Sequence, residues 1–596
     1  MKKFLLPFLS LSLGSLLLAS CSSDIEKGLD SSDFEKVSKG FLSISLVSPH
    51  AVTRADYDED DYEYGTESEN KVNSIRFYFF DAKGVPSPVR KQTASDNYLS
   101  YIDWTPSEND QTTGDPDGTT VEKIVKATIG INQPYGTEHP KLVLAVINPP
   151  EAVKNYSGEL TLNNLKNIVS DYYKGLHDDN FVITNSVYVD SDKNIISATP
   201  ISEDNLKPSA DDPDLKTLVI YVERVLARID LQLNLENTVK TIRPSDGSPE
   251  YQIYQVSQQE VNGDEKDIYM KLLGWNVSRY TITSRLVKDI NKWPTDLFGV
   301  QEPWNISEYH RCFWAINPEN VSYVYNTFEP VPGSNYPYAS QLPIPANGSK
   351  ASPIYTQENA ADYKLATDGT GATKPTSLVF AAQLVDENGD PLSLVRYANK
   401  YYTETGVLNQ IANNLNLWSR TEQIQPDEDQ KEWNGYLYTH ITPSDLKFIS
   451  AEDLYGDKLP DDVAEYFVYV ELSNQAKDVD WYERDSNTGA FTLKENVNDF
   501  ITATVDYLLV WNEGDAYYFI DIRHLGEKKD KPGYWGIVRN HIYNINLKKI
   551  EGLGTPVFNP DQVFDPQHPV TDDNVISAEV RILQWRVVSQ DYEISF

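Results

Sequence analysis

Short apolar and β-branched runs, separated by Asn, Asp, Gly and Pro, recur along this chain. Such a pattern is typical of an all-β protein with many turns. In the segment 540–547, Tyr543, Ile545 and Leu547 alternate with polar residues, which predicts a strand with one buried face. The segment 141–148 is apolar on both faces, which predicts a central strand. The strands predicted in this way cover 74–80, 141–148, 218–233, 376–384, 466–472, 516–523 and 540–547.

Two segments show apolar residues at helical spacing and predict short helices packed on sheets. The residues that carry this spacing are Leu162, Leu165, Ile168, Val169 and Tyr172 in the first segment, and Leu408, Ile411, Ala412 and Leu415 in the second. At 596 residues the chain has room for two or more cores. A turn-rich stretch at 203–214 precedes a predicted strand pair and places a domain boundary near 230–245. We therefore expect a mainly β protein of at least two domains.

The start of the chain has the pattern of an export signal. Two lysines precede an apolar run that ends in Leu18-Ala19-Ser20-Cys21, and this run is too short for a membrane span. The spacing resembles that of a bacterial lipoprotein signal, in which the cysteine is acylated. The alternative is an ordinary signal peptide with an incidental cysteine. We expect lipidation of Cys21.

An alternating apolar segment and an arginine follow the signal. Leu42, Ile44 and Leu46 alternate with serines and predict an amphipathic strand. The bond between Arg54 and Ala55 precedes a very acidic run over 55–64, whose composition opposes tight folding and favours access for a protease. Cleavage there would detach the strand and leave an open sheet edge beside an apolar groove.

The end of the chain is also amphipathic. Two alternating sets on opposite parity predict a strand with a bulge near Val588. A segment this apolar at a chain end needs a partner, and its burial would contribute on the order of 10 kcal/mol before ordering costs. The residues of the two sets are Leu583, Trp585 and Val587, and then Tyr592, Ile594 and Phe596.

Charge and cysteine content argue against certain partners and against internal disulfides. A net charge of −37 and a pI near 4.5 argue against nucleic acid or an anionic membrane surface as partner. Beyond Cys21 the chain has one cysteine, Cys312, so an exported protein of this length must rely on ordinary cores instead of internal disulfides.

Candidate catalytic and metal sites are weak. The segment 386–390 begins like a calcium loop, but Pro391 replaces the required glycine, so a hairpin turn explains it better. His310 and Cys312 would share a strand face, although a small core cysteine is the simpler interpretation. The best polar cluster, with no accompanying nucleophile or metal set, comprises Arg523, His524, Arg539 and His541. We interpret it as hydrogen bonding at strand ends and expect no enzyme activity, no metal and no cofactor.

Three segments together resemble the fimbrillin family of Bacteroidales-type (type V) pili, in particular the major subunits of short fimbriae. The first is the strand over 40–49 followed by Thr53-Arg54-Ala55, and the second is the run 222–228. The third and most specific is the C-terminal region, in which 536–543, 548–554 and 580–596 follow the family in order and character. The ending 592–596 departs from the family's usual acidic-leucine finish.

The resemblance implies two β-sandwich-like (transthyretin-like) domains with a few short helices. It implies a signal peptide over 1–20, a propeptide with a removable strand over 21–54, β domains over 55–235 and 236–570, and a donor-strand region over 571–596. An arginine-specific surface protease would cut after Arg54. The C-terminal strand would then enter the neighbouring copy, with Leu583, Trp585, Val587, Val588, Tyr592, Ile594 and Phe596 as donor residues.

The implied function is that of a structural stalk subunit that supports adhesion and biofilm formation. Its partners would be copies of itself, accessory and anchor subunits, the outer membrane through the precursor's lipid, and host or bacterial receptors. Its location would change from the outer membrane to an extracellular fimbrium. The alternative is a surface glycan-binding lipoprotein, because 38 tyrosines and 11 tryptophans could stack on sugars, although core packing is their commoner use.

Overall fold

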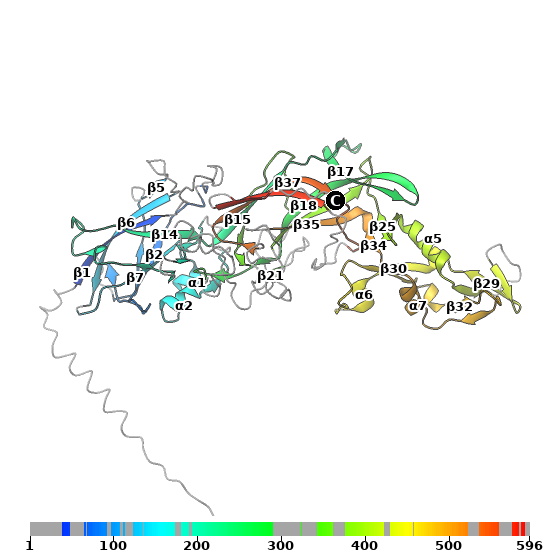
Figure 1. Cartoon of the computed structure of the whole chain (residues 1–596), viewed down its shortest axis with the longest axis horizontal. Coiled ribbons are helices and arrows are strands. Elements are labelled where there is room, and N and C mark those ends of the chain that lie inside the picture. Colours follow the sequence, from blue (N-terminus) through cyan, green and yellow to red (C-terminus); the bar gives the residue numbers. More distant parts are fainter. Residues whose placement is uncertain are drawn as a thin grey trace, which may run out of the picture.

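A computed structural model describes most of the chain (Figure 1). The described residues are 38–47, 65–66, 68–91, 97–107, 111–113, 123–134, 136–172, 180–189, 194–289, 323–324, 342–360, 376–421, 430–456, 458–522, 536–559, 575–582 and 586–590. The molecule is elongated and mainly β, with an N-terminal sheet at one end, further sheets in the middle and a lobe containing helices at the other end (Figure 1).

The N-terminal sheet runs in the order β3-β6-β1-β14-β9-β7-β2-β4, and β5, β12 and β13 pair outside this path. The predicted central strand is β7, which lies between β2 and β9. The bounds are β1 Ser38–Val47, β2 Ile75–Phe80, β3 Arg90–Lys91, β4 Tyr101–Trp104, β5 Gln111–Thr113, β6 Lys123–Gln133, β7 Leu142–Ile147, β9 Ile183–Asn185, β12 Thr199–Pro200, β13 Leu206–Lys207 and β14 Leu218–Arg224, with the helices α1 Glu151–Lys154 and α2 Leu162–Lys166.

Two further sheets form the middle of the molecule. One runs β22-β15-β37-β39-β40, and the other runs β34-β25-β26-β17-β18-β24-β35-β38, with β16 beside β17. Asn262-Gly263 joins β17 to β18 at φ 53° and 96°, as a tight hairpin requires. The bounds are β15 Leu226–Leu233, β16 Val239–Ile242, β17 Tyr251–Val261, β18 Asp264–Ser278, β22 Ile354–Gln357, β24 Ser377–Val385, β25 Leu394–Tyr397, β26 Lys400–Tyr402, β34 Leu509–Trp511, β35 Asp515–Asp521, β37 His541–Glu551, β38 Thr555–Pro556, β39 Val575–Ile582 and β40 Arg586–Gln590.

The lobe at the far end has an apolar core of its own, which includes Val407, Ile411, Val468 and Ile501. A second and larger apolar cluster extends without a break from the N-terminal sheet into the middle sheets. The lobe contains α5 Glu404–Asn414, β27 Trp418–Thr421, β28 Gln430–Trp433, β29 Tyr436–His440, β30 Leu446–Ser450, α6 Ala451–Tyr455, β31 Val468–Leu472, β32 Trp481–Arg484, β33 Phe491–Leu493 and α7 Val497–Thr504.

Short elements complete the described structure. They are the strands β8 Val169–Ser170, β10 Tyr188–Val189, β11 Ile195–Ile196, β19 Tyr280–Thr281, β20 Ser284–Arg285, β21 Tyr323–Val324, β23 Asn359–Ala360 and β36 Gly536–Ile537, and the 3-10 helices η7 Pro443–Asp445, η8 Ala476–Asp478 and η9 Asn512–Gly514.

The structure confirms most predicted strands and corrects two elements. The predicted strand over 218–233 is two strands in two sheets, because the chain leaves β14 at Arg224 and enters β15 at Leu226. The predicted first helix ends at Lys166, and Val169 lies in the short strand β8 with its side chain 43% exposed. The predicted second helix is α5, which Thr403 caps by accepting a hydrogen bond from the amide of Gly406.

The calcium-like segment is a hairpin turn, as predicted. The amide of Asp386 donates to the carbonyl of Asp390 at 2.9 Å, and Val385 pairs with Pro391. Gly389 has a φ of 88°, which a glycine adopts readily.

Candidate functional site

The strand β1 lies inside the N-terminal sheet. It pairs antiparallel with β6 from Ser38↔Gln133 to Val47↔Ile124, and parallel with β14 from Ile44↔Leu218 to Val47↔Tyr221. Its predicted apolar residues Leu42, Ile44 and Leu46 are 0%, 0% and 1% exposed. Figure 1 shows β1 beside β6 and β14 at the end of the molecule that the N-terminal sheet forms.

The neighbours of β1 present an apolar groove to it. Inward-facing side chains of β6 and β14 flank the three buried residues of β1 and are at most 5% exposed, namely Val125, Ala127, Ile129, Ile131, Leu218, Ile220 and Val222. A small cavity adjoins Leu46 at one end of this groove. Its other lining residues are Asn70, Val72, Val125, Ile147, Ile183, Val222 and Arg224. Removal of β1 would therefore leave β6 and β14 without their shared partner and expose an apolar face.

The predicted lipidation and cleavage residues, Cys21, Arg54 and Ala55, lie outside the described residues. The described chain leaves β1 at Val47 and continues from Gly65. The arginine site therefore belongs to the segment that links β1 to the rest of the protein.

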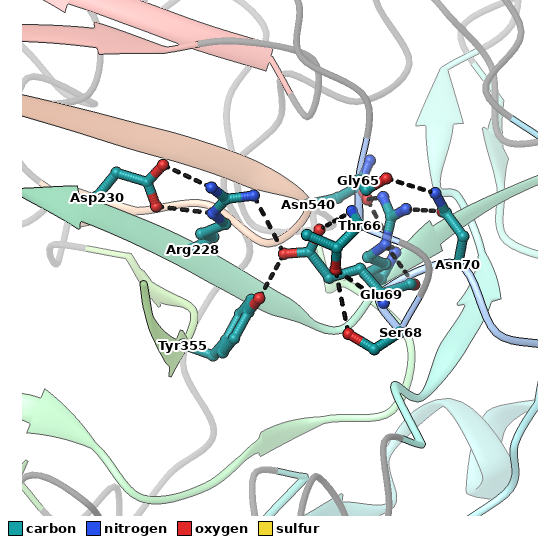
Figure 2. A network of polar contacts seen from close by, with 10 residues as sticks. Gly65, Thr66, Ser68, Glu69, Asn70, Arg228, Asp230, Tyr355 and Asn540 are labelled. Atoms are coloured by element: carbon teal, nitrogen blue, oxygen red, sulfur yellow. Dashed lines mark hydrogen bonds and ion pairs between the residues drawn. The ribbon is translucent and has the colours of Figure 1, made fainter. Parts of the chain in front are cut away.

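A buried polar network fixes the chain just after that segment (Figure 2). The side chain of Glu69 is fully buried, and its carboxylate accepts hydrogen bonds from the Tyr355 hydroxyl at 2.5 Å and from Arg228 at 3.4 Å. Arg228 also forms a bidentate ion pair with Asp230, with both distances 2.7 Å. Burial, and then the neighbouring Glu69 carboxylate, raise the pKa of Tyr355 above its usual value, so the hydroxyl remains a donor.

The same network reaches the C-terminal part of the chain. Arg224 donates from Nε to the carbonyl of Glu69 at 3.0 Å and from Nη1 to the side chain of Asn540 at 3.2 Å. The amide of Asn540 donates to the carbonyl of Leu226 at 2.8 Å. The point at which the chain changes sheet is therefore tied both to the segment near residue 69 and to the start of β37.

A second buried ionic group contains half of the predicted polar cluster. Arg539 is fully buried, forms a bidentate pair with Glu358 and donates to the carbonyl of Leu286 at 2.9 Å. His541 is also buried, and its Nδ1 lies 2.7 Å from the carbonyl oxygen of Arg539. These contacts agree with the interpretation of structural hydrogen bonding at a strand end. Arg523 and His524 lie outside the described residues.

Another ion pair lies close by. Lys288 Nζ contacts Glu223 Oε2 at 2.9 Å, and both side chains are 0% exposed. Burial raises the pKa of Glu223, and the Lys288 ammonium opposes this effect. Buried ion pairs could not be assigned from sequence, because any of the 89 acidic residues could have been a partner.

The predicted donor region forms two strands that run in opposite directions. β39 pairs antiparallel with β37 of the same chain, and β40 pairs antiparallel with β39 through Ile582↔Val587. Val587 and Val588 lie in β40. The chain therefore reverses between Ile582 and Arg586, before the position near Val588 at which the alternation predicts a bulge, and that bulge stays a prediction. The remaining donor residues, Leu583, Trp585, Tyr592, Ile594 and Phe596, lie outside the described residues.

Many of the aromatic residues that motivated the glycan-binding alternative serve as core. Trp275, Trp481 and Trp511 are at most 2% exposed. In the far lobe, Tyr438 stacks on Phe491 at 3.8 Å between ring centroids. Such packing removes ring faces that a sugar would need.

Within the described residues, no helix is long and apolar enough to cross a membrane. That same part of the chain has no cluster of three or more His, Cys, Asp or Glu side chains that could hold a metal ion.

Comparison with known proteins identifies the C-terminal region. Residues 510–591 match the family model described as major fimbrial subunit protein type IV, fimbrillin, C-terminal. This match confirms the resemblance inferred from the sequence and supports a structural role in a fimbria. A comparison with curated protein sequences gives no match.

Solved structures show only a weak likeness. The fimbrilin FimA of Porphyromonas gingivalis is 13% identical, with 92% of this chain and 98% of that chain covered and a TM-score of 0.34. The tip fimbrial protein Mfa3 of the same organism, with a C-terminal truncation, is 11% identical, with 91% and 100% covered and a TM-score of 0.30. A fimbrial assembly protein of Parabacteroides distasonis is 12% identical, with 59% and 85% covered and a TM-score of 0.26. TM-scores this low do not establish a shared fold, so the assignment rests on the match over 510–591.

Proposed function

Because its C-terminal region is that of a fimbrillin, we propose that this chain is a stalk subunit of a surface fimbria, exported as a lipoprotein precursor and polymerised after proteolysis. Cys21 carries the lipid that holds the precursor in the outer membrane. A second acyl chain is needed for stable anchoring, since a single one binds only marginally. The subunit is structural and not an enzyme.

The observation that carries this proposal is the position of β1. A strand with three buried apolar side chains lies inside a sheet, between two other strands. The segment that joins it to the rest of the protein contains Arg54, followed directly by an acidic run whose composition opposes tight folding. A single cut after Arg54 breaks the covalent link between the subunit and the segment that carries β1 and the lipid, so that β1 can be displaced. The groove between β6 and β14 then accepts the C-terminal segment of another copy, with backbone pairing as the main source of affinity.

The partners follow from this assembly. An arginine-specific surface protease makes the cut, copies of the same chain form the stalk, and accessory and anchor subunits complete the fimbrium. The polymer is extracellular and presents its surface to host or bacterial receptors, which supports adhesion and biofilm formation. Nucleic acid is not a partner of so acidic a chain.

The test is the replacement Arg54→Ala in cells that assemble the fimbria. We expect lipid-linked, unpolymerised precursor at the outer membrane, whereas the neighbouring change Thr53→Ala leaves fibres intact. N-terminal sequencing of surface protein checks the cut directly. Normal fibres whose subunits retain residues 21–54 would contradict the proposal.

A further inference from the structure

We propose that the last five residues of one copy, 592–596, replace residues 42–46 of the next copy position for position, so that Phe596 takes the place of Leu46. This inference rests on the proposed function, in which the C-terminus fills the β1 groove. It adds the register and direction of the incoming strand, and it assigns the cavity beside Leu46 as the site of the terminal aromatic ring.

The two segments have matching sequences. β1 reads Leu-Ser-Ile-Ser-Leu over 42–46, and the chain ends in Tyr-Glu-Ile-Ser-Phe over 592–596. Both place apolar side chains at the first, third and fifth positions and share the central Ile-Ser pair. Because strand side chains alternate between faces, a shift of one residue would turn every apolar side chain outward, so the match favours one parity.

The sheet accepts this segment in the direction of β1. An incoming strand with the same direction as β1 would be antiparallel to β6 and parallel to β14. It would form hydrogen bonds with the same backbone groups of β6 and β14 that now pair with β1. In this register Ile594 pairs across to Ala127 and Leu218, as Ile44 does now.

The cavity beside Leu46 favours a phenylalanine over a leucine at this position. Leu46 leaves unfilled space beside it, lined by Val72, Ile147 and Ile183 among others. A phenylalanine at this position extends farther into that space than leucine does, and filling an apolar void adds contacts that the β1 strand does not make. The incoming segment thereby has an advantage over β1 at one defined position.

The flanking residues set the beginning of the exchanged segment. In this register Asp591 takes the position of Phe41, which pairs with Lys207, so opposite charges face each other across the strands. One position earlier stands Gly40, where an added Cβ would lie 2.7 Å from the Leu206 side chain. A side chain such as that of Gln590 can enter there only if Leu206 moves.

Cysteine cross-linking in fibres of the processed full-length subunit tests the register. Ser45 pairs with Lys126 of β6, whose side chain is exposed, so Ser595 of the next copy should lie opposite Lys126. Mild oxidation of the double variant Lys126→Cys/Ser595→Cys should give a ladder of covalent oligomers. The matched pair Lys126→Cys/Glu593→Cys, shifted by two residues, should give at least tenfold less, and neither single variant should cross-link through these sites.

Two further variants separate the register from the donation itself. Truncation after Gln590 should abolish fibres while the subunit stays folded and processed, and Phe596→Leu should leave fibres that dissociate at lower temperature. If the truncation abolishes fibres but the Glu593 pair cross-links better than the Ser595 pair, donation stands and the register proposed here is wrong. Fibres that persist in the truncated protein would overturn both the register and the C-terminal donation.

Discussion

The substitution Ile44→Ala should destabilise the N-terminal sheet of the uncut precursor and leave the stability of the fibre unchanged. Ile44 is fully buried and pairs with Ala127 on one side and Leu218 on the other. Removing three carbons from such a site typically costs about 2–5 kcal/mol, because lost burial and a new cavity add together. After cleavage at Arg54 this residue has left the subunit, so the same change should have no effect on the polymer.

Local hydrogen exchange is the suitable measurement, since a protein with several cores does not unfold as one unit. The precursor would be held uncut by Arg54→Ala, and the amides of residues 123–133 would be followed with and without Ile44→Ala. A loss of about 3 kcal/mol in the opening free energy would accelerate their exchange by roughly two orders of magnitude. The amides of 541–551, in another sheet, are the internal control.

The fibre supplies the reciprocal half of this test. Ile594→Ala should lower the heat resistance of fibres and leave exchange in β6 of the uncut precursor unchanged. If Ile44→Ala weakens fibres as much as it weakens the precursor, β1 has not left the subunit. If it accelerates exchange in neither state, β1 contributes nothing to the sheet, and the reasoning from its burial fails.

Three other outcomes follow from the sequence and the structure. Cys21→Ala should abolish labelling with radioactive fatty acid, and unchanged labelling would refute lipidation. Glu358→Ala leaves the fully buried Arg539 without its carboxylate and should lower the local opening free energy by about 3–5 kcal/mol, measured by hydrogen exchange of the amides of 541–551. Glu358→Gln should cost less, and equal losses would contradict a charge effect. Burial raises the pKa of Glu471, but salt bridges to two lysines outweigh it and leave this pKa below its usual value. The stability that the Glu471 carboxylate contributes is therefore present above the ordinary carboxyl pKa and is lost as the pH falls through the lowered pKa. Acid should destabilise the Glu471→Gln variant less than the parent chain. The same dependence of stability on pH in both proteins would refute this.

Sequence patterns predicted the strands best where one physical rule governed a whole segment. The alternation of Tyr543, Ile545 and Leu547 matches a strand whose three apolar side chains are at most 1% exposed. Likewise the serines between Leu42, Ile44 and Leu46 marked the amphipathic character of β1. In both segments the positions that the period marks as apolar are buried, although Ser45 of β1 is buried as well, and this agreement is why the sequence predicts such strands.

Features that depend on partners distant in the sequence could not be predicted from local patterns. Nothing near residue 225 signals that one apolar run serves two sheets, because the break is imposed by Asn540 and by the carbonyl of Val182, which accepts from the amide of Val225 at 2.9 Å. The separate core of the far lobe was missed for a similar reason, since its helices α6 and α7 are too short to show a helical period. The predicted domain limit at residue 235 stays a prediction, although the chain changes sheet earlier, at Val225.

Cleavage and displacement are separate steps in this assembly, because β1 is held by more than its covalent link. Its ten residues all pair with β6, from Gln133 to Ile124, and its three buried side chains retain their contacts after a cut at Arg54. The cut removes the tether, which otherwise keeps β1 at an effective concentration on the order of millimolar and lets it exclude any incoming segment. Meanwhile, Glu69 and Arg228 keep the chain fixed just after the cut, so the sheet that loses β1 does not lose its attachment to β15 and β37. An incoming C-terminal segment therefore competes with the untethered β1 for the groove between β6 and β14, which is already formed. It displaces β1 if the side chain of Phe596 fills the space beside Leu46.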